Sequence, residues 1–314
     1  MTMYSFGVDI GGTTVKLGFF EASGNLLDSW EIPTRTVDGG KNILPDIAAS
    51  VLGKLKELGI DDDCVKGIGM GVPGPVTNDG TVLKCVNLGW GVFNVCDELS
   101  KLTGMPVKAT NDANAAALGE MWQGGGKGHK DVIMVTLGTG VGGGIIIDGR
   151  IMNGVNGASG EIGHIPVADF DEEADTCGCG KRGCLEQYTS ANGFARITKK
   201  YLEENPDVQS TLRYVPTIDS REIFNAAKDG DEAALHMVDV FARKLGRALA
   251  AVACVIDTEI FVIGGGVSKA GTIVIENVAK YYRQYAFHAS SRAEFALAEL
   301  GNNAGIYGGA ALLL

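Results

Sequence analysis

The 314-residue sequence predicts an α/β fold made of two related domains. Apolar segments typical of strands alternate with segments of helical spacing along the whole chain. The chain holds 46 glycines, about twice the average share, and they follow no three-residue period. A strand, glycine turn and strand occur twice, separated by over a hundred residues, which indicates a duplicated domain.

The first of these units spans Tyr4 to Phe20, where the turn Gly11–Thr14 separates two apolar strands. A third strand over 26–33 completes an antiparallel meander. Apolar residues at helical spacing predict a helix over Ile43–Leu58. A strand over Val65–Met70 follows, and an alanine-rich helix begins after the segment Ala-Thr-Asn-Asp-Ala-Asn.

The second unit spans Asp131 to Asp148, again as strand, glycine turn and strand. Helices are expected over Ser190–Glu204 and Asp231–Val255, with Ser190 and Asp231 suited to cap their first turns. A buried strand over 259–263 opens into a third glycine cluster. The last helix is expected over 304–314, so strands and helices alternate to the end.

Charge and apolar patterning exclude several classes of partner. The 38 acidic and 27 basic residues give a formal charge of −11, which disfavours nucleic-acid binding. The longest apolar run, Ala248–Ile256, is too short to span a membrane. The N-terminal segment has no Lys or Arg before Lys16 and carries Asp9, so it is not expected to be a signal peptide. Seven cysteines without an export signal indicate the cytoplasm, where clustered thiols bind metal more often than they form disulfides.

The glycine turns suit an oxyanion, because backbone N–H groups reach it without a Cβ in the way. Each turn alone is compatible with an ordinary hairpin, whereas the set of three favours a nucleotide. The candidate phosphate and nucleoside contacts are Gly11, Gly12, Thr13, Thr14, Lys16, Gly138, Thr139, Gly140, Gly264, Gly265 and Gly266. Gly138–Gly143 also fits G-x-G-x-x-G, but it runs into strand-forming isoleucines instead of a helix, and no P-loop occurs.

Three cysteines, Cys177, Cys179 and Cys184, lie within eight residues with glycines between them. Three thiolates and one imidazole make a closed tetrahedral set for structural zinc, and His164 is the nearest histidine upstream. The acidic run 169–175 between them is expected to be a solvated loop.

Three carboxylates lie next to these motifs, namely Asp112, Glu161 and Glu186. A zinc loop would hold Glu161 and Glu186 in one place, where paired carboxylates accept hydrogen bonds from the vicinal hydroxyls of a sugar. Asp112 is suited to act as the base that accepts a proton from one sugar hydroxyl. It also suits the N-cap of the helix that starts near Ala113, and the two roles can coexist.

Seven motifs together resemble the ROK family of sugar kinases, and most closely its bacterial glucokinases, over nearly the whole chain. These motifs are Asp9–Lys16, Gly71–Pro75, Asn111–Asn114, Leu137–Gly144, Glu161–His164, Cys177–Glu186 and Gly264–Ser268. The resemblance implies an actin-like, ribonuclease H-like duplicated fold with sugar and nucleotide in a central cleft. It implies a smaller domain of residues 1–115 with 298–314, a larger domain of 116–297 that carries the zinc loop, and a homodimer or homotetramer.

The same resemblance assigns roles to individual residues. Asp112 is the expected catalytic base, and Asp9 joins the glycine turns in binding Mg-ATP. The expected sugar contacts are Asn111, Asp112, Glu161, His164, Glu186, Gly74 and Asn87. His164 would also bind the structural zinc together with Cys177, Cys179 and Cys184.

The activity implied is phosphorylation of glucose at its 6-hydroxyl by ATP. A kinase for another hexose, such as N-acetylmannosamine, fructose or allose, is the first alternative, because the motifs do not distinguish these sugars. A non-catalytic sugar sensor is the second. Some members of the family are repressors with a helix-turn-helix domain ahead of the first motif, and here that motif already begins at Asp9, which favours the kinase.

Overall fold

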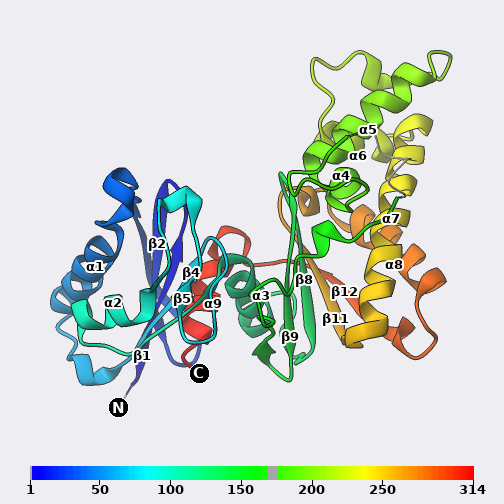
Figure 1. Ribbon diagram of the computed structural model, residues 1–314. Coiled ribbons are helices and arrows are strands. Elements are labelled where there is room, and N and C mark those ends of the chain that lie inside the picture. Colours follow the sequence, from blue (N-terminus) through cyan, green and yellow to red (C-terminus); the bar gives the residue numbers. More distant parts are fainter. Residues whose placement is uncertain (1, 169–174) are drawn as a thin grey trace. The chain divides into compact units, whose positions relative to one another are not determined.

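The computed structural model describes residues 2–168 and 175–314, so most of the acidic run at 169–175 lies outside the described residues. The chain divides into two compact units (Figure 1). The first unit consists of Met1–Lys130, Gly144–Gly160 and Glu299–Leu314, and the second of Asp131–Gly143 and Glu161–Ala298. Each unit is described by itself below.

The first unit is built on a five-stranded sheet with the order β3-β2-β1-β4-β7. The strands β1 to β3 form the expected antiparallel meander, β4 pairs with β1 in parallel, and β7 pairs with β4 in parallel. Their bounds are β1 Tyr4–Ile10, β2 Thr14–Glu21, β3 Leu26–Pro33, β4 Val65–Val72 and β7 Val107–Asn111. A small separate pair joins β5, Thr81–Val82, to β6, Phe93–Asn94.

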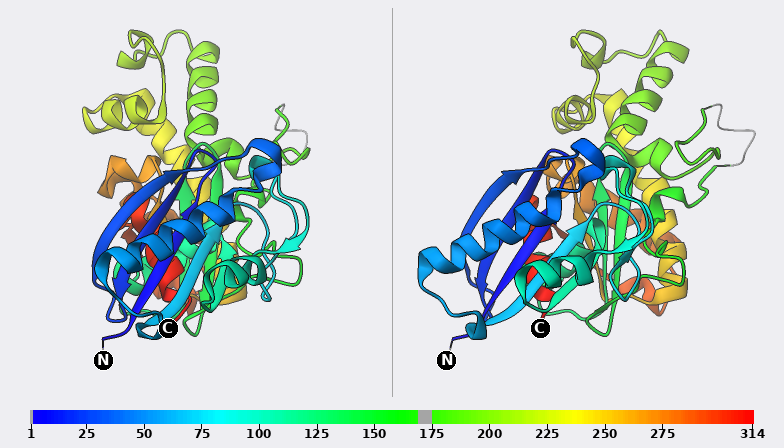
Figure 2. Two further views of the ribbon diagram at one scale, coloured as in Figure 1. Left: turned by 90° about the vertical axis from the view of Figure 1, so that its left-hand side faces the viewer. Right: turned by 60° about the vertical axis from the view of Figure 1, so that its left-hand side comes forward.

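Helices cover both faces of this sheet. Figure 2 shows α1, Ile43–Leu58, lying across one face, where Ile47 and Val51 share a buried core with Phe6 and Val8. On the other face α9, Ala304–Ala311, approaches so closely that a Cβ on Gly7 would overlap the carbonyl of Ile306. The remaining helices of this unit are α2 Val95–Thr103 and α3 Asp112–Gln123.

The second sheet has the order β10-β9-β8-β11-β12. Its strands are β8 Val132–Leu137, β9 Val141–Ile147, β10 Arg150–Ile151, β11 Ile260–Gly264 and β12 Glu294–Leu297. The boundary between the two units falls within β9. Helices of the second unit are α4 Glu186–Thr189, α5 Ala191–Glu204, α6 Ser220–Lys228, α7 Glu232–Ile256 and α8 Thr272–Tyr285.

Most of the elements expected from the sequence are confirmed, including both hairpins and the two N-caps. The Ser190 hydroxyl accepts from the N–H of Gly193, and the Asp231 carboxylate accepts from that of Ala234. The cap expected of Asp112 is different: Asn111 is the N-cap of α3, and its side chain accepts from the N–H groups of Ala113 and Asn114. Asp112 is instead the first residue of the helix.

The division into units differs from the expected domain boundaries over residues 116–130 and 144–160, which lie in the first unit. For residues 116–123 the reason is the packing of α3 against α9. A Cβ on Gly119 would overlap the carbonyl of Ala304, and one on Gly308 would overlap that of Ala115. The two helices therefore meet along their backbones and stay in one unit. Within the described residues, no helix combines the length and the apolar character that a bilayer span requires.

Candidate active site

The first glycine turn joins β1 to β2 in the first unit. The N–H of Gly11 donates to the carbonyl of Thr14 over 2.9 Å, and the Thr34 hydroxyl donates to the carbonyl of Gly11 over 2.7 Å. Gly12, Thr13 and Thr14 are exposed. A Cβ on Gly12 would have no described atom within 4 Å, so the space beside this glycine is open to a ligand.

Asp9 is the second-last residue of β1, directly before this turn. It is opposite Lys16 on β2 and opposite Gly71 on β4. A Cβ on Gly305 of α9 would overlap its carboxylate, so a glycine is required there for the carboxylate to fit. Burial, followed by repulsion from Asp112, raises the pKa of Asp9 to about 6, although Lys16 lowers it. The proximity of two carboxylates is the kind of arrangement that functional sites use.

Asp112 stands at the start of α3, directly after β7, and its side chain is exposed. Its Oδ1 accepts from the N–H of Ala113 over 2.8 Å. The preceding residue fixes this position: Asn111 caps the helix through its Oδ1, while its Nδ2 donates to the carbonyl of Gly74 over 3.1 Å. Gly74 has φ +103°, a conformation that favours glycine.

Two further candidates of the first unit lie nearby. Lys16 donates to the carbonyl of Asn302 over 3.4 Å and lies 3.8 Å from the Glu31 carboxylate. Asn87 is an exposed residue of a short 3₁₀ turn. Its backbone and that of Leu88 contact the Cys85 thiol, whose pKa is raised by burial and, to a smaller extent, by the charge of Asp112. Among the described residues, no hydrogen bond links the Asn87 side chain to the other candidates.

The second glycine turn joins β8 to β9. The N–H of Gly138 donates to the carbonyl of Gly140 over 2.9 Å, and its own carbonyl accepts from the N–H of Ala191 over 2.8 Å. The third glycine cluster adjoins it, because β8 and β11 run parallel and end at the same edge. A Cβ on Gly265, which has φ +83°, would lie 2.5 Å from the carbonyl oxygen of Leu137. The glycine is therefore needed for this close approach.

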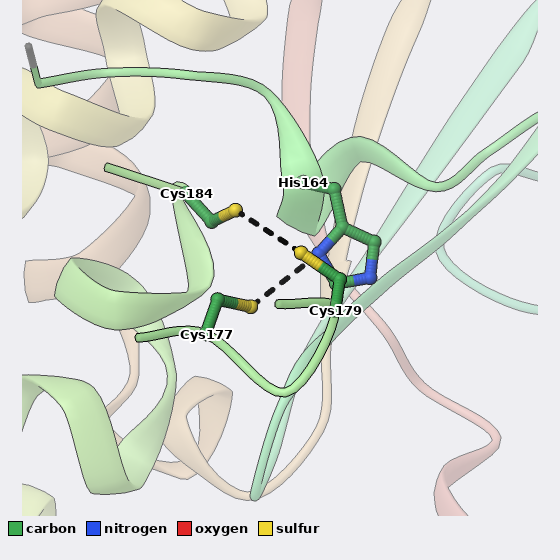
Figure 3. Close-up of side chains that lie close together, drawn as sticks. All are labelled: His164, Cys177, Cys179 and Cys184. Atoms are coloured by element: carbon green, nitrogen blue, oxygen red, sulfur yellow. Dashed lines mark hydrogen bonds between the residues drawn. The ribbon is translucent and has the colours of Figure 1, made fainter. Parts of the chain in front are cut away.

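The predicted metal ligands converge in the second unit. Figure 3 shows His164, Cys177, Cys179 and Cys184 facing one another, and their ligand atoms all lie within 4.8 Å of one another. Cys177 Sγ lies 3.7 Å from His164 Nδ1, and Cys179 Sγ lies 3.7 Å from Cys184 Sγ. Sulfur atoms bound to one zinc at about 2.3 Å are about 3.8 Å apart in a tetrahedron. The donor set therefore fits a tetrahedral metal ion.

The two carboxylates of this unit that are predicted to contact the sugar adjoin the cluster. Glu161 Oε2 lies 3.8 Å from Nε2 of His164, the ring nitrogen that faces away from the sulfur atoms. Glu186 Oε1 accepts from the Cys177 thiol over 3.6 Å, while its Oε2 accepts from the N–H of Val141 over 2.9 Å. A Cβ on Gly140 would overlap that same oxygen. Glu186 therefore connects the metal cluster to the second glycine turn.

Comparison with known proteins identifies the family. A sequence profile described as the ROK family matches residues 5–314. The chain belongs to the ROK family. The glucokinase of Halalkalibacterium halodurans is 44% identical over 96% of this chain and 92% of its own length. A structure of a ROK family glucokinase from Streptomyces griseus in complex with glucose and AMPPNP is 36% identical, covers 98% of each chain and has a TM-score of 0.72.

Another ROK-family structure, of a transcriptional regulator homologous to the E. coli MLC protein, has a TM-score of 0.84. It is 25% identical, and the match covers 99% of this chain and 77% of the regulator. These likenesses confirm the α/β, actin-like fold class that the motifs indicated. The same fold therefore occurs in kinases and in a regulator, so the site must decide between the two functions.

The ROK chain assembles its candidate residues in two groups. The first unit brings together Asp9, Gly11, Gly12, Thr13, Thr14, Lys16, Gly74, Asn111 and Asp112. The second unit brings together Gly138, Thr139, Gly140, Glu161, His164, Cys177, Cys179, Cys184, Glu186, Gly264, Gly265 and Gly266. Sequence reasoning missed Gly305, which makes room for Asp9, since only the space around a glycine reveals such a role.

Proposed function

We propose that this chain is a glucokinase, which transfers the γ-phosphoryl group of Mg-ATP to the 6-hydroxyl of glucose. The observation that carries the proposal is the exposed Asp112 carboxylate at the start of α3, beside the half-buried Asp9 and the open turn at Gly12. The likeness to a glucokinase at 44% identity supports glucose as the acceptor. The neighbour that holds glucose and AMPPNP supports ATP as the donor.

In this proposal Asp112 accepts the proton of the 6-hydroxyl. The freed oxygen forms a bond to the γ-phosphorus as the bond to the leaving ADP oxygen breaks. Asn111 holds Asp112 in position by capping α3 and by donating to Gly74. Because phosphoryl transfer depends mainly on alignment and charge neutralisation, a base held at a fixed helix start is well suited to it.

The other candidates take substrate-binding roles. The turns at Gly11–Thr14 and Gly138–Gly140 bind the phosphates through their hydroxyls and through N–H groups other than those of Gly11 and Gly138, which donate within the hairpins. Gly264–Gly266 contact the nucleoside. Lys16 adds positive charge, and Asp9 completes the nucleotide-binding set. Sugar hydroxyls are bound by Asn111, Glu161, His164 and Glu186, with Gly74 and Asn87 contributing from the first unit.

We assign the Cys/His cluster to a structural zinc ion. His164 would bind it through Nδ1, which leaves Nε2 facing Glu161. Burial, followed by the neighbouring thiols Cys179 and Cys177, raises the pKa of Cys184 to about 12, so a bound cation would be needed to stabilise the closely spaced thiolates. All four protein ligands are then used, which is typical of a structural site. We expect a homodimer or homotetramer, which sedimentation would test.

The test is ADP release from Mg-ATP with glucose, fructose, N-acetylmannosamine or no sugar. We expect turnover with glucose to exceed that with the other sugars at least tenfold. Asp112→Asn should lower kcat by roughly 10²–10⁴-fold while glucose binding, measured by calorimetry, changes little. Asp63→Asn is the matched control, because Asp63 is an exposed aspartate of the same unit outside the candidate site.

The alternatives predict different results. A kinase for N-acetylmannosamine, fructose or allose would retain the dependence on Asp112 but prefer the other sugar. A non-catalytic sensor would bind glucose without releasing ADP, and Asp112→Asn would then change nothing. Near-normal turnover of Asp112→Asn in an active protein would contradict the assignment of the base.

A further inference from the structure

A pocket of about 420 Å³ opens on the first unit, and its lining includes neither Asp112 nor the first glycine turn. Its wall is formed by β7, by the segment 78–80, by β10 and by the residues at the end of α9. Volumes of roughly 300–1,000 Å³ are typical of small-molecule sites. None of the roles proposed above uses this pocket, although its lining is rich in polar side chains.

Two cations line the pocket, Lys108 of β7 and Arg150 of β10. In the part of the chain that is described, neither forms an ion pair with a carboxylate, and Lys108 Nζ donates only to the carbonyl of Leu312 over 2.8 Å. The one acidic side chain of the lining, Asp79, accepts from the hydroxyls of Thr77 and Thr81. Since those hydroxyls already bind both carboxylate oxygens, the two cations are available to an anion.

A chain of hydrogen-bonded amide side chains leads from the pocket wall to the first turn of α3. Asn153 lines the pocket, and its Nδ2 donates to Oδ1 of Asn78 over 2.6 Å. Its Oδ1 accepts from Nδ2 of Asn114 over 2.9 Å and from the Thr110 hydroxyl over 3.4 Å. Asn114 is buried in the first turn of α3, two residues after Asp112. A ligand that competes for the hydrogen bonds of Asn153 would therefore disturb the start of α3.

We propose that this pocket is a regulatory site for a small phosphate monoester of the sugar-phosphate class. The phosphate would be bound by Lys108 and Arg150, since a guanidinium binds phosphate oxygens in a bidentate manner. The hydroxyls of the sugar would be bound by the amides of Asn78 and Asn153. The expected consequence for turnover rests on the proposed kinase function, whereas the binding itself does not.

The direct test is calorimetry with glucose 6-phosphate and, separately, inorganic phosphate. Both are titrated into the zinc-loaded protein, alone and after saturation with glucose and AMPPNP, which occupy the proposed substrate sites. We expect the ester to bind in both cases, at least tenfold more tightly than inorganic phosphate. The double substitution Lys108→Gln with Arg150→Gln should weaken this binding at least tenfold, while kcat and KM for glucose stay within twofold.

The matched control is Lys56→Gln, which removes one cation from the exposed face of α1 in the same unit. It should leave ester binding unchanged. The absence of binding to the saturated protein, or binding that the double substitution does not weaken, would overturn the proposal. Equal affinity for inorganic phosphate and the ester would also overturn it, because the amides would then contribute nothing.

A kinetic measurement tests the connection to Asp112. Glucose 6-phosphate should lower the apparent kcat without raising KM for glucose, and this component should disappear in the double variant. Purely competitive inhibition that the double variant retains would place the ester at the substrate site only and so contradict regulation. If the chain lacked kinase activity, the binding test would still apply, so the two proposals fail independently.

Discussion

The two glycine turns have the same local form but are held in place by different means. The turn at Gly11–Thr14 is held by hydrogen bonds within its own meander, including that from the Thr34 hydroxyl to Gly11. The turn at Gly138–Gly140 is contacted by Glu186, from a segment more than forty residues further along the chain. Glu186 is in turn contacted by Cys177 of the metal cluster.

The two groups of candidate residues are therefore held in position by different interactions. In the first unit the position of the Asp9 carboxylate is fixed by close packing, since the glycine at 305 leaves room for it. In the second unit it comes from a loop that four ligand side chains would close around an ion. The first unit should therefore tolerate metal removal, and the second should tolerate small changes of packing around Asp9.

The largest effect is expected from loss of the metal. Chelation, or Cys177→Ser, should lower turnover at least 100-fold, because Glu186, Glu161 and the second turn lose their common support. The structural contribution of such sites is large enough for small domains to unfold without the ion. Zinc content by elemental analysis and turnover before and after zinc is restored are the measurements.

The matched control is Cys254→Ser, because Cys254 is an exposed cysteine of the same unit outside the cluster. It should retain zinc and full turnover. A metal-free protein with undiminished activity would show that the loop holds Glu186 in position without an ion, and the contrast between the two turns would then disappear.

The sequence was sufficient to predict features that depend on residues close together in the chain. Both hairpins follow from alternating apolar residues around glycines, and the cysteine cluster follows from three thiols in eight residues with one histidine nearby. The cap of α3 was harder, because Asn111 and Asp112 both suit that position. Only the backbone geometry distinguishes them, since Asn111 is extended and Asp112 is already helical.

Long-range packing was beyond reach of the sequence. Nothing in the motif around Asp9 indicates that a glycine 296 residues later must lie against its carboxylate. The same is true of Asn153, which contacts Asn114 only because the end of β10 lies beside α3 in the fold. The short helices α2 and α6 were also missed, since nine residues give few repeats of a helical period.

A smaller effect is expected when the packing around Asp9 is disturbed. Gly305→Ala puts a methyl group where the Asp9 carboxylate lies. The intrinsic gain of about 1 kcal/mol for alanine in a helix should be outweighed, with a net loss of about 1–3 kcal/mol in the free energy of unfolding. Turnover should fall about tenfold, since Asp9 must move. Urea denaturation and steady-state kinetics are the measurements, and zinc content should not change.

Gly53→Ala is the matched control, because a Cβ on that glycine of α1 would have no described atom within 4 Å. It should be neutral or slightly stabilising. If Gly305→Ala behaved in the same way, the carboxylate would have room to spare. The candidate residues of the first unit would then have to be held in position by the hydrogen bonds of its turn alone.

The smallest effect is the pH dependence that Asp9 gives to stability. Because its pKa is raised from 3.8 to about 6 in the folded chain, the folded state binds the proton more tightly than the unfolded state does. Ionisation therefore destabilises the fold as the pH rises from about 4 to above 6, and below about 4 no cost remains. Asp9→Asn should remove a penalty of at most about 3 kcal/mol at pH 8 and have little effect at pH 4. Denaturation of both proteins across that range measures it.

Repulsion from Asp112 is the second cause of the raised pKa of Asp9, after burial. Asp112→Asn should therefore lower the pKa of Asp9 and reduce the penalty that Asp9→Asn removes at pH 8. A carboxyl titration followed by NMR would separate the two causes, because the part due to burial stays and the part due to the neighbouring charge goes. A titration of Asp9 near pH 4 in both proteins would mean that the glycines leave the carboxylate solvated. The first half of the site would then lack the close packing that distinguishes it from the second.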